Sequence, residues 1–241
     1  MLDSRQLELL KQGAGEFGLE LSDLQLQRFS VFASLLLEWN RKLNLTRITD
    51  PTEIVIKHFL DSLSCFAVAD FPLDAKVIDV GTGAGFPGIP IEIARPDLNI
   101  TLLDSTRKRL AFLESVAVEL ELGGVLLVHG RAEDAGQDIE RREFYDVAVA
   151  RAVARMNALA EYTLPLVRLG GFAIAQKGSE VADELKDAEP GITLLGGEVE
   201  KVARVTLPYS DITRSVIVIR KVLNTPHVYP RKPAAIEKQP L

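Results

Sequence analysis

The stretch Asp79-Val-Gly-Thr-Gly-Ala-Gly-Phe-Pro-Gly88 decides the fold, because an apolar run leads directly into closely spaced glycines. Gly81, Gly83 and Gly85 follow the spacing G-x-G-x-G. Glycine allows a tight backbone turn, and its missing side chain lets a ligand lie against the chain. In an open α/β sheet, ligands bind where loops leave the carboxyl ends of the strands. A simple turn needs one glycine rather than three, so the stretch predicts a loop that holds a cofactor.

Short apolar runs alternate with helical stretches on both sides of this loop. The runs are Val77–Val80, Ile100–Leu103, Val125–Val128, Tyr145–Val149 and Gly171–Ala175. The expected helices between them are Gly88–Ala94, Thr106–Leu122 and Met156–Leu169. This alternation predicts an α/β fold, a parallel sheet with helices on both faces.

Two further β-like segments, Val199–Leu207 and Ser215–Val222, follow each other with no helix between them. They are therefore expected to pair as an antiparallel hairpin at the end of the sheet. The tail from Asn224 contains four prolines and is expected to be extended and mobile.

The region before the first strand is expected to be helical. Ser22 followed by Gln25 is a capping-box pattern. Apolar residues at helical spacing follow it, and a second helix is expected to begin near Pro51. The chain thus divides into a helical extension (1–72), a cofactor-binding core (73–223) and a basic, proline-rich tail (224–241).

Composition narrows the class of protein. Hydrophobic residues make up 47% and charged residues 26%, as in ordinary globular proteins. No apolar run approaches the roughly 18–20 residues of a membrane span, and the first residues lack a signal-peptide pattern, so a cytoplasmic protein is expected. A single cysteine, Cys65, excludes an internal disulfide, and the spacing of the histidines suggests no metal site. The net charge of −6 argues weakly against a nucleic-acid partner, but it does not forbid a basic face.

The spacing of the glycines favours one cofactor over another. Dinucleotide-binding loops follow G-x-G-x-x-G, and here Phe86 stands where the third glycine would be. S-adenosylmethionine has no phosphate to hold, so the spacing leans towards this ligand. Asp104, at the end of the second strand, is placed to accept hydrogen bonds from both ribose hydroxyls, although nicotinamide cofactors use the same device. Its alternative role is to cap the following helix.

Two later strand ends carry further candidates. Glu133 follows the third strand, where an adenine ring would lie, unless Arg131 to Asp134 form only a solvated turn. Arg151 follows the fourth strand and is expected to point into the ligand crevice, where it could pair with the cofactor carboxylate or with substrate. A solvent-exposed arginine at a helix start is the alternative. The sequence singles out no catalytic acid or base.

What is missing indicates the chemistry. Amino methylation of adenine or cytosine uses an Asn/Asp-Pro-Pro-Tyr/Phe loop after the fourth strand, where this chain has Arg151-Ala-Val-Ala154. Methylation of pyrimidine C5 needs a cysteine nucleophile, and Cys65 lies outside the strand ends. A target with a free in-plane lone pair, such as guanine N7, needs only to be held in line with the methyl group.

The chain resembles the bacterial small-subunit ribosomal RNA methyltransferase G family, also called glucose-inhibited division protein B. The resemblance rests on Trp39-Asn40, Leu43-Asn-Leu-Thr46, His58, Asp61-Ser-Leu63, Asp79–Pro90, Leu102–Ser105, Lys108-Arg109, Arg131-Ala-Glu133, Ala150-Arg-Ala152, Tyr229–Lys232 and Lys238–Leu241. It implies a class I, Rossmann-like methyltransferase fold, a seven-stranded, mostly parallel sheet, and methylation of N7 of guanosine 527 in 16S ribosomal RNA. The substrate would be this RNA, the small ribosomal subunit or an assembly intermediate. The cofactor residues that it implies are Gly81, Phe86, Asp104, Ser105, Thr106, Ala132, Glu133 and Arg151.

Three other functions stay open from the residues alone. They are a nicotinamide-dependent dehydrogenase, a non-catalytic cofactor-binding factor of ribosome assembly, and a small-molecule methyltransferase. Basic residues group at Arg41–Arg47, Arg107–Arg109 and Arg231-Lys232. If these groups lie on one side of the molecule, they would form a rim that binds RNA phosphates.

Overall fold

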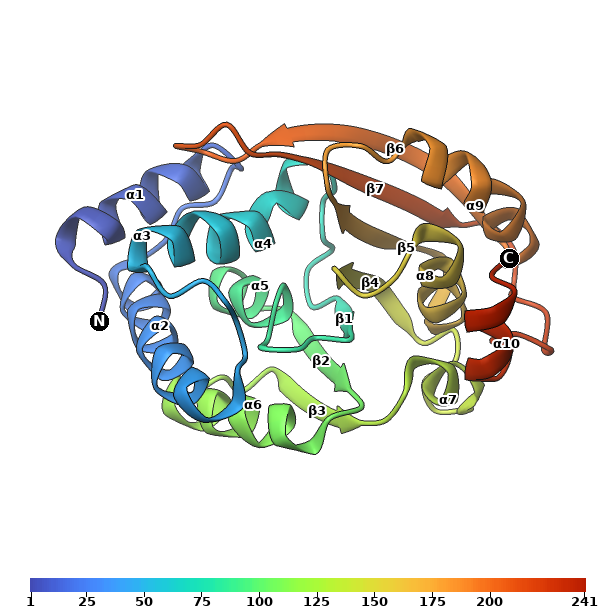
Figure 1. Cartoon of the computed structure of the whole chain (residues 1–241), viewed down its shortest axis with the longest axis horizontal. Coiled ribbons are helices and arrows are strands. Elements are labelled where there is room, and N and C mark those ends of the chain that lie inside the picture. The colour runs from blue at the N-terminus through green and yellow to red at the C-terminus, as the bar shows by residue number, and fades with distance from the viewer.

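Seven strands form one sheet at the centre of the computed structural model, which describes residues 1–241 (Figure 1). The strand order is β3-β2-β1-β4-β5-β7-β6. The strands are β1 (Lys76–Val80), β2 (Asn99–Asp104), β3 (Val125–His129), β4 (Tyr145–Arg151), β5 (Val167–Lys177), β6 (Gly197–Thr206) and β7 (Thr213–Lys221). The first five are parallel, and β7 is antiparallel to both β5 and β6. The predicted parallel sheet and terminal hairpin are confirmed.

The chain order reverses at β1, which lies between β2 and β4. The connections after β1 and β4 therefore run to opposite sides, and a crevice opens between them at the carboxyl ends of the strands. The glycine loop leaves β1 at this point.

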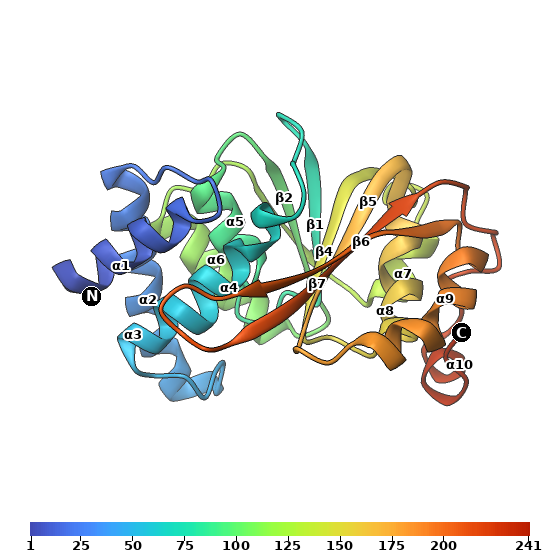
Figure 2. The same ribbon diagram turned by 90° about the horizontal axis from the view of Figure 1, so that it is seen from above.

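Helices cover both faces of the sheet, as the view from above shows (Figure 2). One face carries α5 (Gly88–Ala94), α6 (Arg107–Glu119) and the helical extension. The other face carries α7 (Ala132–Gln137), α8 (Met156–Thr163), α9 (Ala182–Leu194) and α10 (Pro233–Lys238). Two separate apolar cores result, one on each side of the strands.

The helical extension packs on the sheet through an aromatic cluster. It begins with α1 (Ser4–Gly15) and α2 (Asp23–Leu43), and the predicted Ser22–Gln25 capping box is present at the start of α2. Phe32 is fully buried and lies close to Phe59, Phe86 and Phe112. Residues 1–72 therefore share the apolar core on this face of the sheet with residues from the strands, α5 and α6.

The second helical segment begins at Pro51, as predicted, but it is irregular. It runs from α3 (Pro51–Ile54) through a π-helical stretch (Val55–Leu60) into α4 (Asp61–Leu63) and a 3-10 turn (Ser64–Ala67). Isolated π-helical turns occur mostly within α-helices and are frequent at functional sites. This one carries His58 towards the glycine loop.

Two predicted elements differ from the structure. The expected helix Met156–Leu169 ends at Thr163, because Pro165 cannot continue the α-helical hydrogen bonds, and β5 already begins at Val167. The tail, which was predicted to be extended, is only partly so. Part of the tail forms α10, and Arg142 donates hydrogen bonds to the carbonyl groups of Thr225 and Tyr229, at 2.7 and 2.6 Å.

Candidate functional site

The three glycines of the loop all adopt the left-handed conformation that favours glycine. Their φ angles are 71° at Gly81, 61° at Gly83 and 90° at Gly85. The backbone N–H groups of Gly81 and Thr82 both donate to the Leu103 carbonyl, at 2.9 and 3.1 Å, so the end of β2 anchors the loop. The predicted tight turn is therefore present, and it needs glycine at each of the three positions.

The three glycines face different surroundings. A Cβ atom on Gly85 would lie 2.7 Å from Ile89 and 2.8 Å from Leu113, so this glycine permits close packing of α5 and α6. On Gly83 the nearest atom would be the Gly81 carbonyl oxygen, at 3.9 Å. The most open face of the loop therefore lies at Gly83.

Asp79 supports the loop from inside the core. Its Oδ2 accepts hydrogen bonds from Thr82 Oγ1 at 2.6 Å and from the Gly88 N–H at 2.8 Å. Oδ1 is buried and has no partner in the protein. Burial raises the pKa of Asp79 to about 6, although the bond from Thr82 opposes the shift.

A cavity of about 290 Å³ lies at the carboxyl ends of the strands. Five predicted cofactor residues line it: Gly81, Asp104, Ser105, Ala132 and Glu133. Its other lining residues are Val80, Leu103, Arg109, Gly130, Arg131, Ala152, Val153 and Tyr162. The predicted residues Gly83, Gly85, Phe86, Thr106 and Arg151 lie outside this lining. The structure thus brings half of the predicted set together around one cavity.

Two buried carboxylates face this cavity. Asp104 Oδ1 accepts from the Thr106 N–H at 2.8 Å, and Oδ2 accepts from the Gly83 N–H at 3.0 Å. Asp104 therefore stabilises both the start of α6 and the glycine loop, and the predicted ribose contact would come in addition to these bonds. Glu133 is buried in the first turn of α7, and its nearest cation is the guanidinium of Arg131, at 3.8 Å.

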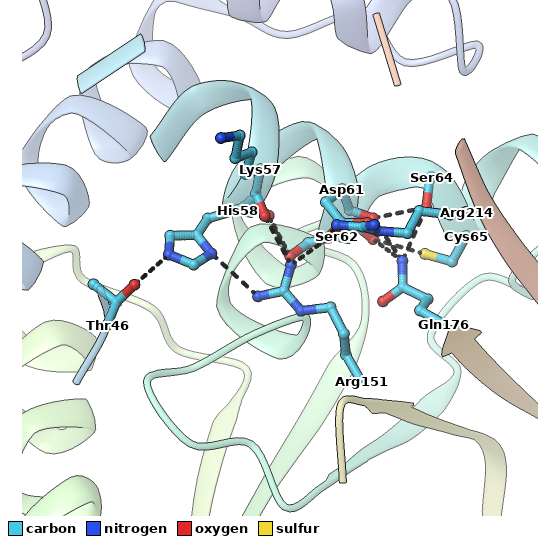
Figure 3. Close-up of polar contacts among 10 residues, drawn as sticks. All are labelled: Thr46, Lys57, His58, Asp61, Ser62, Ser64, Cys65, Arg151, Gln176 and Arg214. Carbon is cyan, nitrogen blue, oxygen red and sulfur yellow. Dashed lines mark hydrogen bonds and ion pairs between the residues drawn. The ribbon is translucent and has the colours of Figure 1, made fainter. Parts of the chain in front are cut away.

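Arg151 is not part of the lining of this cavity, and its side chain points towards the helical extension (Figure 3). Its Nη1 lies 3.2 Å from Asp61 Oδ2. Arg214 of β7 binds the same carboxylate, with Nε 3.0 Å from Oδ1. Burial lowers the pKa of Arg151, and Asp61 opposes the shift. The alternative of a solvent-exposed arginine is wrong, because Arg151 is bound inside the protein.

His58 joins the extension to the glycine loop. Its ring stacks on Phe86 with 4.5 Å between centroids, and its Nε2 lies 2.8 Å from Thr46 Oγ1 (Figure 3). Burial, reinforced by the charge of Arg151, lowers the pKa of His58 to about 3, so the ring is neutral. His58 is thus a packed, hydrogen-bonded residue. The roles of Asp61 and Arg214 were missed, since no local pattern reports partners so far apart in sequence.

Known proteins of similar sequence show the family to which this chain belongs. The sequence model described as rRNA small subunit methyltransferase G matches residues 25–213. Ribosomal RNA small subunit methyltransferase G of Alkaliphilus oremlandii is 51% identical over 97% of this chain and 98% of its own length. The same-named protein of a Thermoanaerobacter species is 48% identical over the full length of both. The chain belongs to this family.

Family membership confirms several predictions. The chain is a ribosomal RNA methyltransferase, S-adenosylmethionine is its cofactor, and the dehydrogenase alternative is excluded. Solved structures agree on the fold. TrmN from Thermus thermophilus gives a TM-score of 0.53 at 18% identity, covering 68% of this chain and 48% of its own. A mutant form of MtNAS gives 0.56 at 15% identity, covering 83% and 75%. The predicted class I fold is thus confirmed.

The groups of basic residues in this methyltransferase differ in their surroundings. Arg107, Lys108 and Arg109 are exposed at the start of α6, beside the cavity. Arg231 instead binds the fully buried Glu161, with Nη2 2.6 Å from Oε2, and so holds the tail against α8. No helix of the structure has the length and apolarity to cross a membrane.

Proposed function

We propose that this chain transfers the methyl group of S-adenosylmethionine to N7 of guanosine 527 in 16S ribosomal RNA. The main support for the cofactor site is the cavity between the glycine loop and the strand ends, where Asp104 and Glu133 are buried. The cofactor supplies an electrophilic methyl group on its sulfonium. The chain's own contribution is to hold the two reactants in line.

The residues present fit this cofactor. Asp104 would accept hydrogen bonds from the ribose hydroxyls and Glu133 from the adenine amino group. The open face of Gly83 leaves room for the ligand backbone. The cluster of Asp61 with Arg151 and Arg214 carries one surplus positive charge. This surplus would attract the cofactor carboxylate, although neither guanidinium is free of its ion pair.

The chemistry of the acceptor agrees with the side chains near the loop. Guanine N7 has an in-plane lone pair and carries no proton, so its methylation requires no general base. The imidazole in contact with the loop, His58, is held neutral between Thr46 and Arg151. The imidazole at the end of β3, His129, has its Nε2 3.1 Å from the Ser105 carbonyl. Orientation alone therefore accounts for the reaction, which favours N7 over an amino group.

Exposed basic side chains supply a surface for RNA phosphates. Arg107 to Arg109 follow β2, Arg131 follows β3 and Arg155 follows β4, so all lie at the crevice edge of the sheet. They would bind the 16S RNA, in the small subunit or in an assembly intermediate, despite the acidic total charge. With such a partner the protein acts in the cytoplasm.

The experiment that tests this function is a map of N7-methylguanosine in 16S RNA from cells with and without the gene. Loss of a single N7-methylguanosine at position 527, restored by the wild-type gene and not by Gly83→Val, is the expected result. An unchanged map would favour a non-catalytic assembly factor. If the purified protein methylates a small molecule and not the RNA, the result would favour the small-molecule methyltransferase.

A further inference from the structure

Thr46 is held in place more firmly than a loop residue requires. It lies three residues beyond the end of α2, after Asn44 in the left-handed conformation (φ 50°). The Asn40 side chain binds its backbone twice: Nδ2 donates to the Thr46 carbonyl at 2.9 Å, and Oδ1 accepts from the Thr46 N–H at 2.8 Å. The position of the Thr46 side chain is thus fixed by α2.

The proton positions around Thr46 follow from Arg151. A guanidinium can only donate hydrogen bonds, and Arg151 Nη2 faces His58 Nδ1 at 3.5 Å. The lone pair of the neutral imidazole therefore lies on Nδ1, and its proton lies on Nε2. His58 Nε2 then donates to Thr46 Oγ1, at 2.8 Å.

The hydroxyl of Thr46 consequently has one unused function. Its oxygen already accepts from His58 and from the Ile48 N–H, at 3.0 Å. Both lone pairs are occupied, so the hydroxyl can act only as a donor. The protein offers no acceptor for this proton, and the side chain is only partly buried. A donor in a fixed place without an acceptor is suited to a ligand.

The place of this donor points to the methyl acceptor. His58 links Thr46 to the glycine loop, because its ring stacks on Phe86 at 4.5 Å between centroids. Thr46 contacts Nε2 of this ring, and Arg151 at the end of β4 contacts Nδ1 (Figure 3). A cofactor held by the glycine loop would present its methyl group to the acceptor base, and Phe86 of this loop is in contact with His58.

We propose that the Thr46 hydroxyl donates a hydrogen bond to O6 of the target guanine; this rests on the N7 methylation proposed above. Guanine presents two adjacent acceptors, N7 and O6, whereas adenine presents the acceptor N7 beside the donor amino group N6. A hydroxyl that can only donate forms a hydrogen bond with O6 of guanine. It forms none with the N6 amino group of adenine, which is itself a donor. Thr46 is thus a specificity-determining residue, and His58 is the positioning residue that fixes its proton.

The test compares two 16S RNAs, joined by splinted ligation, that carry guanine or 2-aminopurine at position 527. 2-Aminopurine keeps N7 and has hydrogen in place of O6. Single-turnover methylation is measured for wild type, Thr46→Val and Thr46→Ser. Thr46→Val is expected to lower the rate on guanine about 10-fold, as for loss of one hydrogen bond, and to leave the rate on 2-aminopurine unchanged. Thr46→Ser, which keeps the hydroxyl, is expected to restore the rate on guanine.

Each other outcome decides against the proposal. Equal losses on both RNAs would assign Thr46 a structural role only, and wild-type rates in Thr46→Val on guanine would show that O6 is not bound there. Melting temperature and cofactor affinity, measured by calorimetry, report any change of fold in the variants. A wild-type enzyme that methylates the guanine RNA at an atom other than N7 would overturn the proposed function itself, which distinguishes that failure from a failure of Thr46.

Discussion

Asp61 Oδ2 lies 3.2 Å from Arg151 Nη1, so a buried ion pair joins the helical extension to the end of β4. The same carboxylate also binds Arg214. One carboxylate thus balances two guanidinium groups that come from two different strands. The end of β4, the extension and the hairpin are tied together at this single side chain.

The first prediction concerns Asp61→Asn. The amide keeps the shape but leaves Arg151 and Arg214 without a counter-charge, and breaking a buried pair in this way costs about 3–5 kcal/mol. Urea unfolding should show this loss. The control is Glu53→Gln, which removes the exposed pair with Lys57 and should cost at most about 1 kcal/mol. Equal losses in both variants would contradict a central role for Asp61.

The second prediction separates two glycines of the loop. Gly83→Ala adds a methyl group that meets no protein atom closer than 3.9 Å, so it should lower cofactor affinity with only the small cost of its positive φ. Gly85→Ala places the methyl group against Ile89 and Leu113 and should also lower the melting temperature. Calorimetric titration and thermal unfolding measure the two effects. Unimpaired binding by Gly83→Ala would show that the ligand does not approach this glycine.

The third prediction tests the ribose contact of Asp104. Asp104→Ala should weaken cofactor binding by about 1–3 kcal/mol, against little change in Asp134→Ala, an exposed residue of α7. Because Asp104 also binds the Gly83 N–H, the loop alone could account for part of the loss. S-adenosylhomocysteine and its 2′-deoxy analogue distinguish the two. If Asp104 binds the ribose, Asp104→Ala should bind S-adenosylhomocysteine and its 2′-deoxy analogue with similar affinity. If the variant still prefers the ligand with the 2′-hydroxyl as strongly as the wild type does, Asp104 only supports the loop.

The fourth prediction is a dependence of stability on pH through Glu92. Burial raises the pKa of this α5 carboxyl to about 7 from 4.5, although the Gly124 N–H opposes the shift. Between these values the folded protein binds more protons than the unfolded chain, so its stability falls as pH rises from 4.5 to 7. Glu92→Gln stays neutral and should be the more stable protein above about pH 7, with the advantage disappearing near pH 4.5.

Urea unfolding at about pH 5 and about pH 8, on either side of the window in which Glu92 loses its proton, measures this difference. The matched control is Glu114→Gln, which removes an exposed carboxylate of α6. Its difference in unfolding free energy from wild type is subtracted from that of Glu92→Gln at each pH. A stability advantage of Glu92→Gln that is the same at both pH values would contradict the argument.

The fifth prediction concerns the tail. Arg231→Ala leaves the fully buried Glu161 without its cation and should destabilise the protein by about 3–5 kcal/mol. The neighbouring Lys232→Ala, at an exposed residue, should have little effect. Proteolysis at the tail should become faster in Arg231→Ala alone. A tail that is cut at equal rates in both variants would show that the ion pair does not hold it.

The local features of this protein follow from its sequence because their causes lie within a few residues. Short apolar runs that alternate with helical stretches predicted the five parallel strands, and the capping box at Ser22 predicted the start of α2. The glycine spacing predicted the turn, since each glycine has a positive φ. The cavity residues Asp104 and Glu133 were also predictable, because parallel strands bring their carboxyl ends to one edge of the sheet.

Only the tertiary structure decided where Arg151 points. From its position after β4 it was expected in the crevice, but its partner Asp61 lies 90 residues earlier and Arg214 lies 153 residues after Asp61. The tail was likewise expected to be extended, and Glu161 draws Arg231 into the protein from 70 residues away. A buried charge is stable only beside an opposite charge, and the fold alone determines which distant side chain provides it.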